Sequence, residues 1–284
     1  ELCLQDTWIS SQVNKAQWSA YFLNLQRILD ECWESGTIVG CGRGSGVGFL
    51  LLYCLDITQI NPLREKAKTF RFRFLNPSRV SVLDIDVDIS GLNRAQVLEH
   101  IRKVYGQDHV ANVLTLRRET AKSAILAAGR SLGIDNDVTQ YISSLIPMER
   151  GMLWSLHDCM YGNGDDRAPV AAFVKAMTED YPEIWEIVQK TENLIVGMGE
   201  HAGGVIFVDE PFENSTALMR APNGDVITQF ELHTSEKASL IKYDLLSVEA
   251  MDKIQICLEL LVKDGLVKQY PTLRETYENY IGIY

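Results

Sequence analysis

The spacing of apolar residues predicts alternating helices and strands in the first part of the chain. Apolar residues recur at three- and four-residue intervals between residues 15 and 33, which is typical of an amphipathic helix ending at Gly36. The β-branched run at residues 37–39 predicts a short strand, and an apolar helix is expected after the glycine-rich segment at residues 40–48. The next predicted elements are a strand at 79–89, a helix at 93–105 with Asn93 as its N-cap, and a strand at 110–114.

The pattern changes beyond residue 114. From about residue 115 to 191 nearly every segment is typical of a helix, with breaks at Gly133, Pro147, residues 161–166 and Pro182. Strands are predicted again at 204–208, 226–230 and 240–245, ahead of a helix at 248–262. A mixed sheet with a helical insertion explains this order better than a continuous alternation of strands and helices, so the sequence predicts an α+β fold.

Composition places the chain among ordinary globular proteins. Its 284 residues, 46% of them hydrophobic, suffice for one large domain or two small ones with buried cores. The longest apolar stretches are interrupted or too short to span a bilayer, and the N-terminus lacks the layout of a signal peptide. We therefore expect a cytoplasmic protein with no membrane partner. Because the sequence starts at Glu1 and stops at Tyr284 directly after a helical region, we also expect a fragment.

Cysteine usage and charge each argue against a class of site. The six cysteines are scattered, without a Cys-x-x-Cys pair or histidines at zinc spacing, so we expect free, buried thiols. A net charge of -11 argues against a surface that binds nucleic acid throughout. Two local clusters partly offset that charge: Arg64, Lys66, Lys68, Arg71 and Arg73 in one, and Arg117, Arg118, Lys122 and Arg130 in the other. Taken alone, each cluster is better explained as a solvated face.

The strongest candidate for chemistry is the segment at residues 84–89, where Asp84, Asp86 and Asp88 alternate with apolar residues. Side chains alternate across a strand, so the three carboxylates face one way and the apolar side chains face a core. Neighbouring carboxylates start about 6.6 Å apart, close enough to converge on divalent cations that cancel their repulsion. The competing interpretation is an exposed edge strand with an acidic face. We judge it weaker because Asp is a poor strand former and needs compensation there.

A second acidic position gains meaning only in combination with the first. Lys242 and Asp244 share one face of a predicted strand. Phosphoryl transfer with two metal ions needs carboxylates that converge from adjacent strands and a nearby cation for the phosphates. Taken alone, the pair is better explained as a surface ion pair at the end of a strand.

The glycine-rich segment at residues 40–48 is a candidate anion-binding loop. Glycines let backbone N–H groups approach an anion, and the N-terminus of the helix predicted after them adds favourable partial charge. The segment has neither the P-loop nor the Rossmann spacing, which argues against both of these nucleotide sites. Arg43 and Ser45 offer a guanidinium and a hydroxyl instead. The alternative is a tight strand-to-helix turn whose glycines serve close packing.

His201 stands beside glycines, in the segment Gly199-Glu200-His201-Ala202-Gly203-Gly204. A histidine in such a setting more often holds a loop by hydrogen bonds than acts as a ligand or a proton carrier. Spacing alone therefore assigns it no catalytic role.

Together these residues resemble one family, the C-family bacterial replicative DNA polymerases, whose type is the alpha subunit of DNA polymerase III. The matching blocks occur in family order over roughly residues 38–250. The main blocks are Gly42-Arg43-Gly44-Ser45-Gly46, Asp84-Ile85-Asp86-Val87-Asp88, His201-Ala202-Gly203-Gly204-Val205 and Lys242-Tyr243-Asp244. Shorter matches lie at residues 56–58, 61–63, 73–77, 79–81, 121–122, 129–130 and 228–230.

The resemblance implies a palm of the polymerase-beta-like nucleotidyltransferase kind, a mixed sheet with flanking helices, into which a helical thumb is inserted. On this basis residues 1–114 and 196–250 form the palm, residues 115–195 the thumb, and residues 251–284 the start of the fingers. It also implies that Asp86, Asp88 and Asp244 are the catalytic residues and the ligands of two Mg²⁺ ions. The triphosphate of the incoming nucleotide is expected at Arg43, Gly44, Ser45 and Lys242.

The function that the resemblance implies is template-directed DNA synthesis, with nucleotidyl transfer from a dNTP to the primer 3′-hydroxyl. The expected partners are primer–template DNA and dNTP, joined in a full-length protein by a sliding clamp and other replisome subunits; the isolated fragment need not be active. Two alternatives stay open at this point. One is a nucleotidyltransferase that works without a template, and the other is a catalytically silent DNA-binding module, which the acidic charge disfavours.

Three positions depart from the family pattern. Leu83 stands where proline is usual before the aspartates, Glu200 where lysine is usual, and Ser247 where glycine is common. None of them is an expected metal ligand, but Glu200 removes a positive charge near the expected path of the DNA. These departures indicate a divergent member, such as one from a phage or an unusual bacterium.

Overall fold

The chain divides into two compact units. The computed structural model describes residues 18–64, 85–164, 166–238 and 240–281. Unit 1 comprises Glu1–Leu114 and Glu200–Tyr284, and unit 2 comprises Thr115–Gly199. The helical stretch expected from residue 115 onward thus belongs to a unit with its own core, inserted between two parts of the other.

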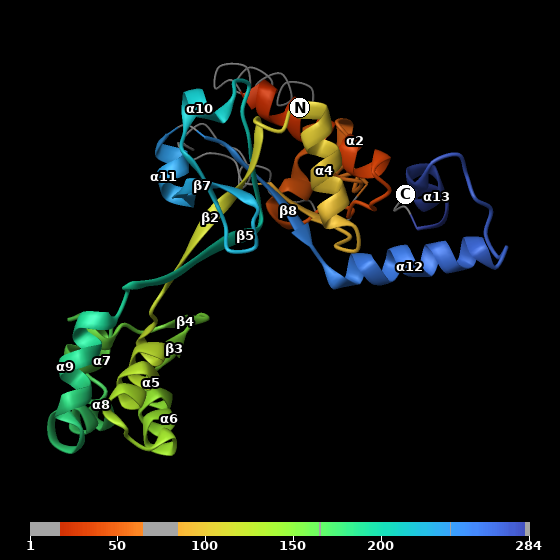
Figure 1. Cartoon of the computed structure of the whole chain (residues 1–284). Helices are drawn as coiled ribbons and strands as arrows, with labels where there is room; N and C mark the ends of the chain where they lie inside the picture. The colour runs from red at the N-terminus through yellow and green to blue at the C-terminus, as the bar shows by residue number, and fades with distance from the viewer. Residues whose placement is uncertain (1–17, 65–84, 165, 239, 282–284) are drawn as a thin grey trace. The chain divides into compact units, whose positions relative to one another are not determined.

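Unit 1 is built on a six-stranded mixed sheet with the order β1-β8-β5-β2-β7-β6 (Figure 1). Its strands are β1 (Asp86–Ile89), β2 (Val110–Arg118), β5 (Ile195–Phe207), β6 (Leu218–Arg220), β7 (Val226–Glu231) and β8 (Lys242–Ser247). The pairs β1–β8 and β2–β7 are parallel, whereas β5–β8 and β6–β7 are antiparallel. The predicted α+β class with a mixed sheet is therefore confirmed.

Unit 1 also contains helices, some of which lie against the two faces of this sheet. They are α2 (Trp18–Glu34), the 3₁₀ helix η1 (Gly44–Gly48), α3 (Leu50–Cys54), α4 (Arg94–Tyr105), α10 (Phe212–Ser215), α11 (Leu232–Lys237), α12 (Glu249–Lys263) and α13 (Leu273–Tyr280). In Figure 1, α2 and α4 lie on one side of the strands and α10 and α11 on the other. The core on the α2 side includes Phe22, Leu25, Ile28, Phe49, Val87, Ile89, Ile101 and Leu245. The smaller core on the α10 side consists of Ala111, Val113, Ile206, Phe212 and Leu240.

Unit 2 is a small helical unit with a core of its own. Its elements are α5 (Ala121–Leu132), α6 (Asn136–Ser144), β3 (Met148–Glu149), β4 (Met152–Leu153), α7 (Leu156–Tyr161), α8 (Ala171–Lys175), the π-helix η3 (Ala176–Asp180) and α9 (Pro182–Thr191). A capping box between Thr120 and Ser123 starts α5, and Gly133 ends it in the left-handed conformation with φ 71°. Gly129 allows α6 to pack close to α5, because a Cβ at that position would meet the Thr139 side chain.

The main differences from the predicted elements lie in strands whose partners are distant in sequence. β5 begins at Ile195 rather than at residue 204, and β2 continues to Arg118 rather than ending at 114. These two strands are neighbours in the sheet, so each extends the other without a local apolar pattern. The strand predicted at residues 37–39 is reduced to one bridge between Val39 and Ile89, and residues 79–84 lie outside the described residues.

The cysteines of the described residues are free thiols, as predicted, but not all of them are buried. Cys32 and Cys159 are buried, Cys41 is half-buried, and Cys54 and Cys257 are exposed. Composition alone cannot distinguish buried from exposed cysteines. The exposure of Cys54 and Cys257 depends on which face of its helix each residue occupies. Among the described residues, no helix combines the length and apolar character that a membrane crossing requires.

Thiol labelling of the native protein tests this burial. Burial raises the pKa of Cys32 to about 12, so this thiol stays protonated at about pH 8 and only about one molecule in 10⁴ carries the reactive thiolate. We expect a maleimide or disulfide reagent to modify Cys54 and Cys257 and to spare Cys32, with the modified peptides identified by mass spectrometry. In urea all of these thiols should react alike. Labelling of native Cys32 as fast as Cys257 would show that α2 does not pack as described.

Candidate active site

The acidic residues of β1 and β8 lie on neighbouring strands and share one face of the sheet. In the parallel pairing of these strands, Asp86 lies directly opposite Asp244. Along β1, Asp86 and Asp88 are partly exposed while the residues that alternate with them are buried, as the period of a strand requires. Side chains opposite each other on paired strands point to the same face. The structure thus places these three predicted site residues together, although 156 positions separate Asp88 from Asp244 in the sequence.

Arg43 reaches the two carboxylates of β1 from the glycine-rich segment. Its Nη1 atom donates to Asp88 Oδ1 at 2.9 Å, and its Nε atom lies 3.7 Å from Asp86 Oδ2. The guanidinium therefore offsets the repulsion between two like charges on one strand face. The Arg43 side chain remains 43% exposed, so the contact lies where solvent and solutes can reach it.

Lys242 and Asp244 form a much less exposed pair. The Lys242 Nζ atom lies 2.5 Å from Asp244 Oδ2, and the two side chains are only 10% and 4% exposed. Both residues point to the same face of β8, as the sequence predicted from their two-residue spacing. An ion pair this close to the core differs from the surface pair that the isolated motif suggested, since taking both charges out of water is costly unless they are tightly paired.

The glycine-rich segment is fastened directly onto the strand of the aspartates. The Gly40 N–H donates to the Asp88 carbonyl oxygen at 2.8 Å. A Cβ at Gly40 would stand 3.0 Å from the Asp88 Cβ, so any larger residue would push these two segments apart by a few tenths of an ångström. Gly42 has φ +119° and faces Val47 and Thr58 at similarly short range.

Beyond these glycines the chain forms a short turn and not the start of a long helix. Gly44–Gly48 is a single 3₁₀ helix, and α3 after it has five residues. The expected charge of a long helix N-terminus is therefore a weak contribution here. What remains of the predicted anion cradle is the exposed Gly44 and Ser45 together with the guanidinium of Arg43.

β5 completes the site on the far side of β8. Gly204 lies opposite Asp244, and a Cβ there would come within 3.0 Å of Lys242 Cδ. The His201 Nδ1 atom accepts hydrogen bonds from the Gly203 and Gly204 N–H groups at 3.2 and 2.7 Å. His201 thus makes hydrogen bonds to the backbone, as expected, but it does so within strand β5 and not in a loop. Gly204 was not singled out from the sequence, although a pair of glycines within a strand indicates a close approach of another group.

Arg94 is a further residue of the site that the sequence analysis missed. Its Nη1 atom donates to the carbonyl oxygen of Leu245, the residue after Asp244, at 2.6 Å. Burial lowers the pKa of Arg94, and the nearby Glu200 counteracts this effect. A basic residue in the first turn of a helix opposes the helix dipole, which is a weak sequence signal of another role.

Of the three departures from the family pattern, Glu200 and Ser247 lie in the described residues. The carboxylate of Glu200 accepts hydrogen bonds from the side-chain amides of Asn112 and Asn223. Because both donors are neutral, they hold the Glu200 side chain in unit 1 without cancelling its negative charge. Ser247 is the last residue of β8. Leu83 and Asp84 lie outside the described residues.

The three aspartates offer the kind of donor that hard divalent cations bind, but in this structure their oxygens do not all lie within 4.8 Å of one another. All their donors are carboxylate oxygens, which Mg²⁺ prefers, and they lie on one face of two strands about 4.8 Å apart. Their oxygens are turned toward Arg43 and Lys242. Among the described residues, the group of acidic and histidine side chains whose ligand atoms all lie within 4.8 Å of one another is Glu31, Glu34 and His100. Cation binding would therefore require a local rotation of the aspartate side chains.

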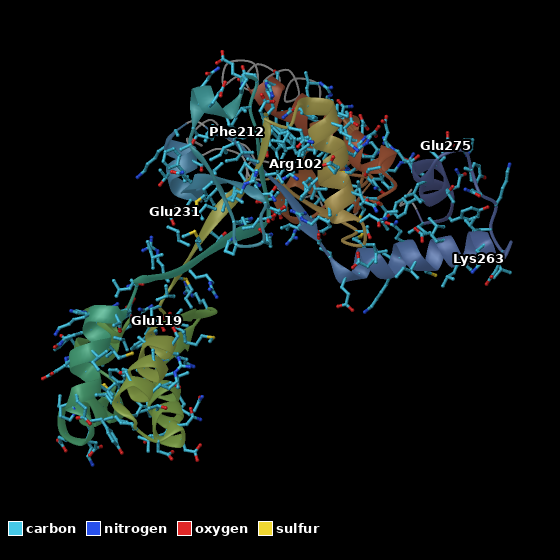
Figure 2. All side chains as sticks on the ribbon, viewed as in Figure 1. Arg102, Glu119, Phe212, Glu231, Lys263 and Glu275 are labelled. Carbon is cyan, nitrogen blue, oxygen red and sulfur yellow. The ribbon has the colours of Figure 1, made fainter. Side chains whose placement is uncertain are left out.

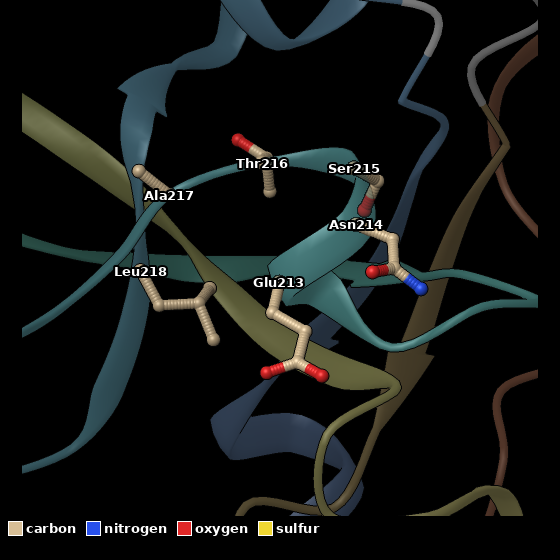
Figure 3. A pocket seen from close by; sticks show the side chains of 6 residues that line it. All are labelled: Glu213, Asn214, Ser215, Thr216, Ala217 and Leu218. Atoms are coloured by element: carbon tan, nitrogen blue, oxygen red, sulfur yellow. The ribbon is translucent and has the colours of Figure 1, made fainter.

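A separate hollow lies on the surface of unit 1. The residues that line this space of about 520 Å³ all come from one segment, which runs from α10 to the first residue of β6 (Figure 3). They are Glu213, Asn214, Ser215, Thr216, Ala217 and Leu218. None of them was predicted for the site, and none comes from β1 or β8.

The known proteins whose sequences are similar to this chain are DNA polymerases. A family model described as the bacterial DNA polymerase III alpha NTPase domain matches residues 10–247. The chain is 37% identical over 283 residues to the probable DNA polymerase YorL of Bacillus subtilis (strain 168), and equally to a DNA-directed DNA polymerase of Bacillus phage SPbeta; each match covers 98% of this chain and 22% of the relative. It is 33% identical over 252 residues to the DNA polymerase III subunit alpha of Escherichia coli (strain K12), covering 88% of this chain and 21% of that protein. The chain thus spans about a fifth of the length of these relatives.

Proposed function

Because the chain belongs to the family of the bacterial DNA polymerase III alpha NTPase domain, we propose that it carries the catalytic centre of a longer, template-directed DNA polymerase. The observation that supports this most is the register of β1 with β8, which puts Asp86 opposite Asp244 and on the same face as Asp88. A binding module without chemistry has no need for three carboxylates gathered against their mutual repulsion. The proposed reaction is nucleotidyl transfer from a dNTP to the 3′-hydroxyl of a primer.

In this proposal Asp86, Asp88 and Asp244 hold two Mg²⁺ ions. The chemistry that such a pair of ions supplies is activation of the attacking hydroxyl and stabilisation of charge on the triphosphate. Asp88 and Asp244 come from neighbouring strands, so the sheet, and not a loop, sets the positions of these proposed ligands. Rigid placement of ligands is what allows oxygen donors to select a cation with strict geometric demands.

Arg43, Gly44, Ser45 and Lys242 are the proposed contacts to the triphosphate. Arg43 pairs with Asp86 and Asp88 at a partly exposed position, and surface ion pairs of this kind contribute only about 0–1 kcal/mol. The guanidinium can therefore exchange a carboxylate for a phosphate oxygen at little cost. Lys242 is more firmly held by Asp244, and its charge neutralises the same face of β8.

The remaining assignments follow from the family and stay proposals. Unit 2 is the proposed thumb, and its exposed Arg117 and Arg118 are candidates for contacts to the backbone of primer–template DNA. The segment from residue 251 onward is the proposed start of the fingers. A sliding clamp and other replisome subunits are proposed partners of the longer protein, and the cytoplasm is its proposed location.

Template-dependent primer extension by the full-length protein that carries this chain tests the proposed function. Four templates that differ only in the first unpaired base should each direct the incorporation of the complementary dNTP, in the presence of Mg²⁺. Addition of the same nucleotides on all four templates would indicate a non-templated nucleotidyltransferase. DNA binding without any incorporation would indicate a silent binding module, and either outcome would overturn the proposal.

A further inference from the structure

Helix α12 forms hydrogen bonds with the end of the strand that carries Asp86 and Asp88 and with the start of the segment that carries Arg43. It begins at Glu249, directly after β8, and runs to Lys263 (Figure 2). The Val248 N–H, just ahead of the helix, donates to the Ile89 carbonyl oxygen at 3.1 Å. The first turns of α12 therefore lie against the end of β1, although 159 positions separate Val248 from Ile89.

Asp252 binds the chain where it leaves β1. Its Oδ1 atom accepts hydrogen bonds from the Ser90 hydroxyl at 2.9 Å and from the Gly91 N–H at 2.6 Å. Ser90 is fully buried. A helix cap would bond to the N–H groups of its own first turn, whereas both of these donors lie more than 160 positions away. The carboxylate thus holds another segment and does not serve its own helix.

Gln255, one turn later, binds the chain where it enters the glycine-rich segment. Its Oε1 atom accepts from the Ile38 N–H at 3.2 Å, and its Nε2 atom donates to the Gly36 carbonyl oxygen at 3.0 Å. The side chain is only 1% exposed. A buried amide with both of its polar atoms bonded to backbone fixes that backbone in one position.

These two segments are also bonded to each other. The Ser90 N–H donates to the Ile38 carbonyl oxygen at 3.1 Å, and the Gly40 N–H donates to that of Asp88 at 2.8 Å. Residues 36–40 and 88–91 therefore form one hydrogen-bonded frame, with Asp252 and Gln255 on its outer side. Hydrogen bonds thus join α12 to the strand end that carries Asp88 and to the start of the loop that carries Arg43.

We propose that Asp252 and Gln255 are positioning residues for nucleotidyl transfer, which set the backbone of Asp88 and of the Arg43 loop from α12. The inference rests on the proposed function but names residues and a role outside it. Neither residue touches the reacting atoms in this arrangement; each acts through the hydrogen-bonded frame. Displacement of a reacting group by about 1 Å can lower a rate about a hundredfold, so small losses of order in the frame matter.

The test compares Asp252→Ala, Asp252→Asn and Glu249→Ala in the full-length protein. Asn keeps an oxygen acceptor in place of the carboxylate, and Glu249 is an 80% exposed carboxylate on the same helix whose partner is Lys253. For Asp252→Ala we expect kcat to fall about tenfold to a hundredfold with the KM for dNTP within about twofold of wild type. Asp252→Asn should recover most of kcat, and Glu249→Ala should behave as wild type.

Hydrogen–deuterium exchange gives a readout that does not depend on activity. In Asp252→Ala the amides of Gly40 and Gly91 should exchange faster, because they lie in the frame, while those of β7 should not change. Ser90→Ala removes one of the two donors to Asp252, so it should lower kcat less, and the double variant Ser90→Ala/Asp252→Ala should be no worse than Asp252→Ala. If Asp252→Ala does not fold, Ser90→Ala alone tests the inference: its kcat should fall while its KM for dNTP stays near that of wild type.

Several results would overturn the inference. They are an unchanged kcat in Asp252→Ala, an equal loss in Asp252→Asn, which would assign the effect to charge, and unchanged exchange at Gly40 and Gly91. If wild type extends primers by template and Asp86→Asn does not, while Asp252→Ala is fully active, only this inference fails. If wild type makes no templated product, the proposed function fails and the inference falls with it.

Discussion

Replacing Asp86 with asparagine is expected to lower templated DNA synthesis by a factor on the order of 10³ while leaving the fold almost unchanged. The side chain is 39% exposed, and it forms an ion pair with Arg43 at 3.7 Å, so its loss should cost less than about 1 kcal/mol of the free energy of unfolding. Asn keeps the shape of the side chain but not the negative charge that a divalent cation needs. A large loss of rate without a loss of stability would separate a functional carboxylate from a structural one.

Single-turnover primer extension and urea unfolding of the same preparations measure the two quantities. Asp108→Asn is the matched control, because Asp108 is another exposed aspartate of unit 1, at 64%, paired with His109 outside the site. The control should retain full synthesis. Wild-type synthesis by Asp86→Asn would remove Asp86 from the catalytic set.

Replacing Lys242 with methionine is expected to reduce both stability and synthesis. The Lys242 Nζ atom lies 2.5 Å from Asp244 Oδ2 at positions that are 10% and 4% exposed. Removing one member of such a pair leaves the other charge in a poorly hydrated place, which typically costs about 3 kcal/mol of the free energy of unfolding. Loss of the cation near the triphosphate should in addition lower synthesis about a hundredfold.

Lys103→Met provides the comparison for stability. Lys103 pairs with Glu99 at 3.7 Å on the surface of α4, where its side chain is 68% exposed, so the same substitution should cost less than about 0.5 kcal/mol. Lys242→Arg should retain more synthesis than Lys242→Met, since the charge remains. Equal unfolding free energies for the two methionine variants would show that the pair on β8 is solvated and contributes little.

Local sequence patterns were sufficient to predict which residue types form the site and which face of each strand they occupy. The alternation of aspartates with apolar residues predicted that Asp86 and Asp88 face away from the core, and the spacing of Lys242 and Asp244 predicted a shared face. Both follow from the two-residue period of a strand, which is visible in these two segments of the sequence. Helices with a strong apolar period, such as α2 and α12, were predicted with nearly correct bounds for the same reason.

Pairing between distant strands could not be predicted in this way. That β8 lies beside β1, with Asp244 opposite Asp86, is a property of tertiary packing, and only the resemblance to a family suggested it. The extension of β5 back to Ile195 and of β2 to Arg118 depends equally on a partner strand. The contacts of Arg94, Asp252 and Gln255 join segments about 150 to 220 positions apart, and no local pattern reports them.

Crystallography with Mn²⁺ and a non-hydrolysable dNTP tests the central claim most directly, because anomalous scattering locates the metal without assumptions. We expect two metal peaks beside the sheet, with carboxylate oxygens of Asp86, Asp88 and Asp244 about 2.1 Å from them and the triphosphate toward Arg43. Metal and nucleotide bound away from β1 and β8, with Asp244 still held by Lys242, would contradict the account.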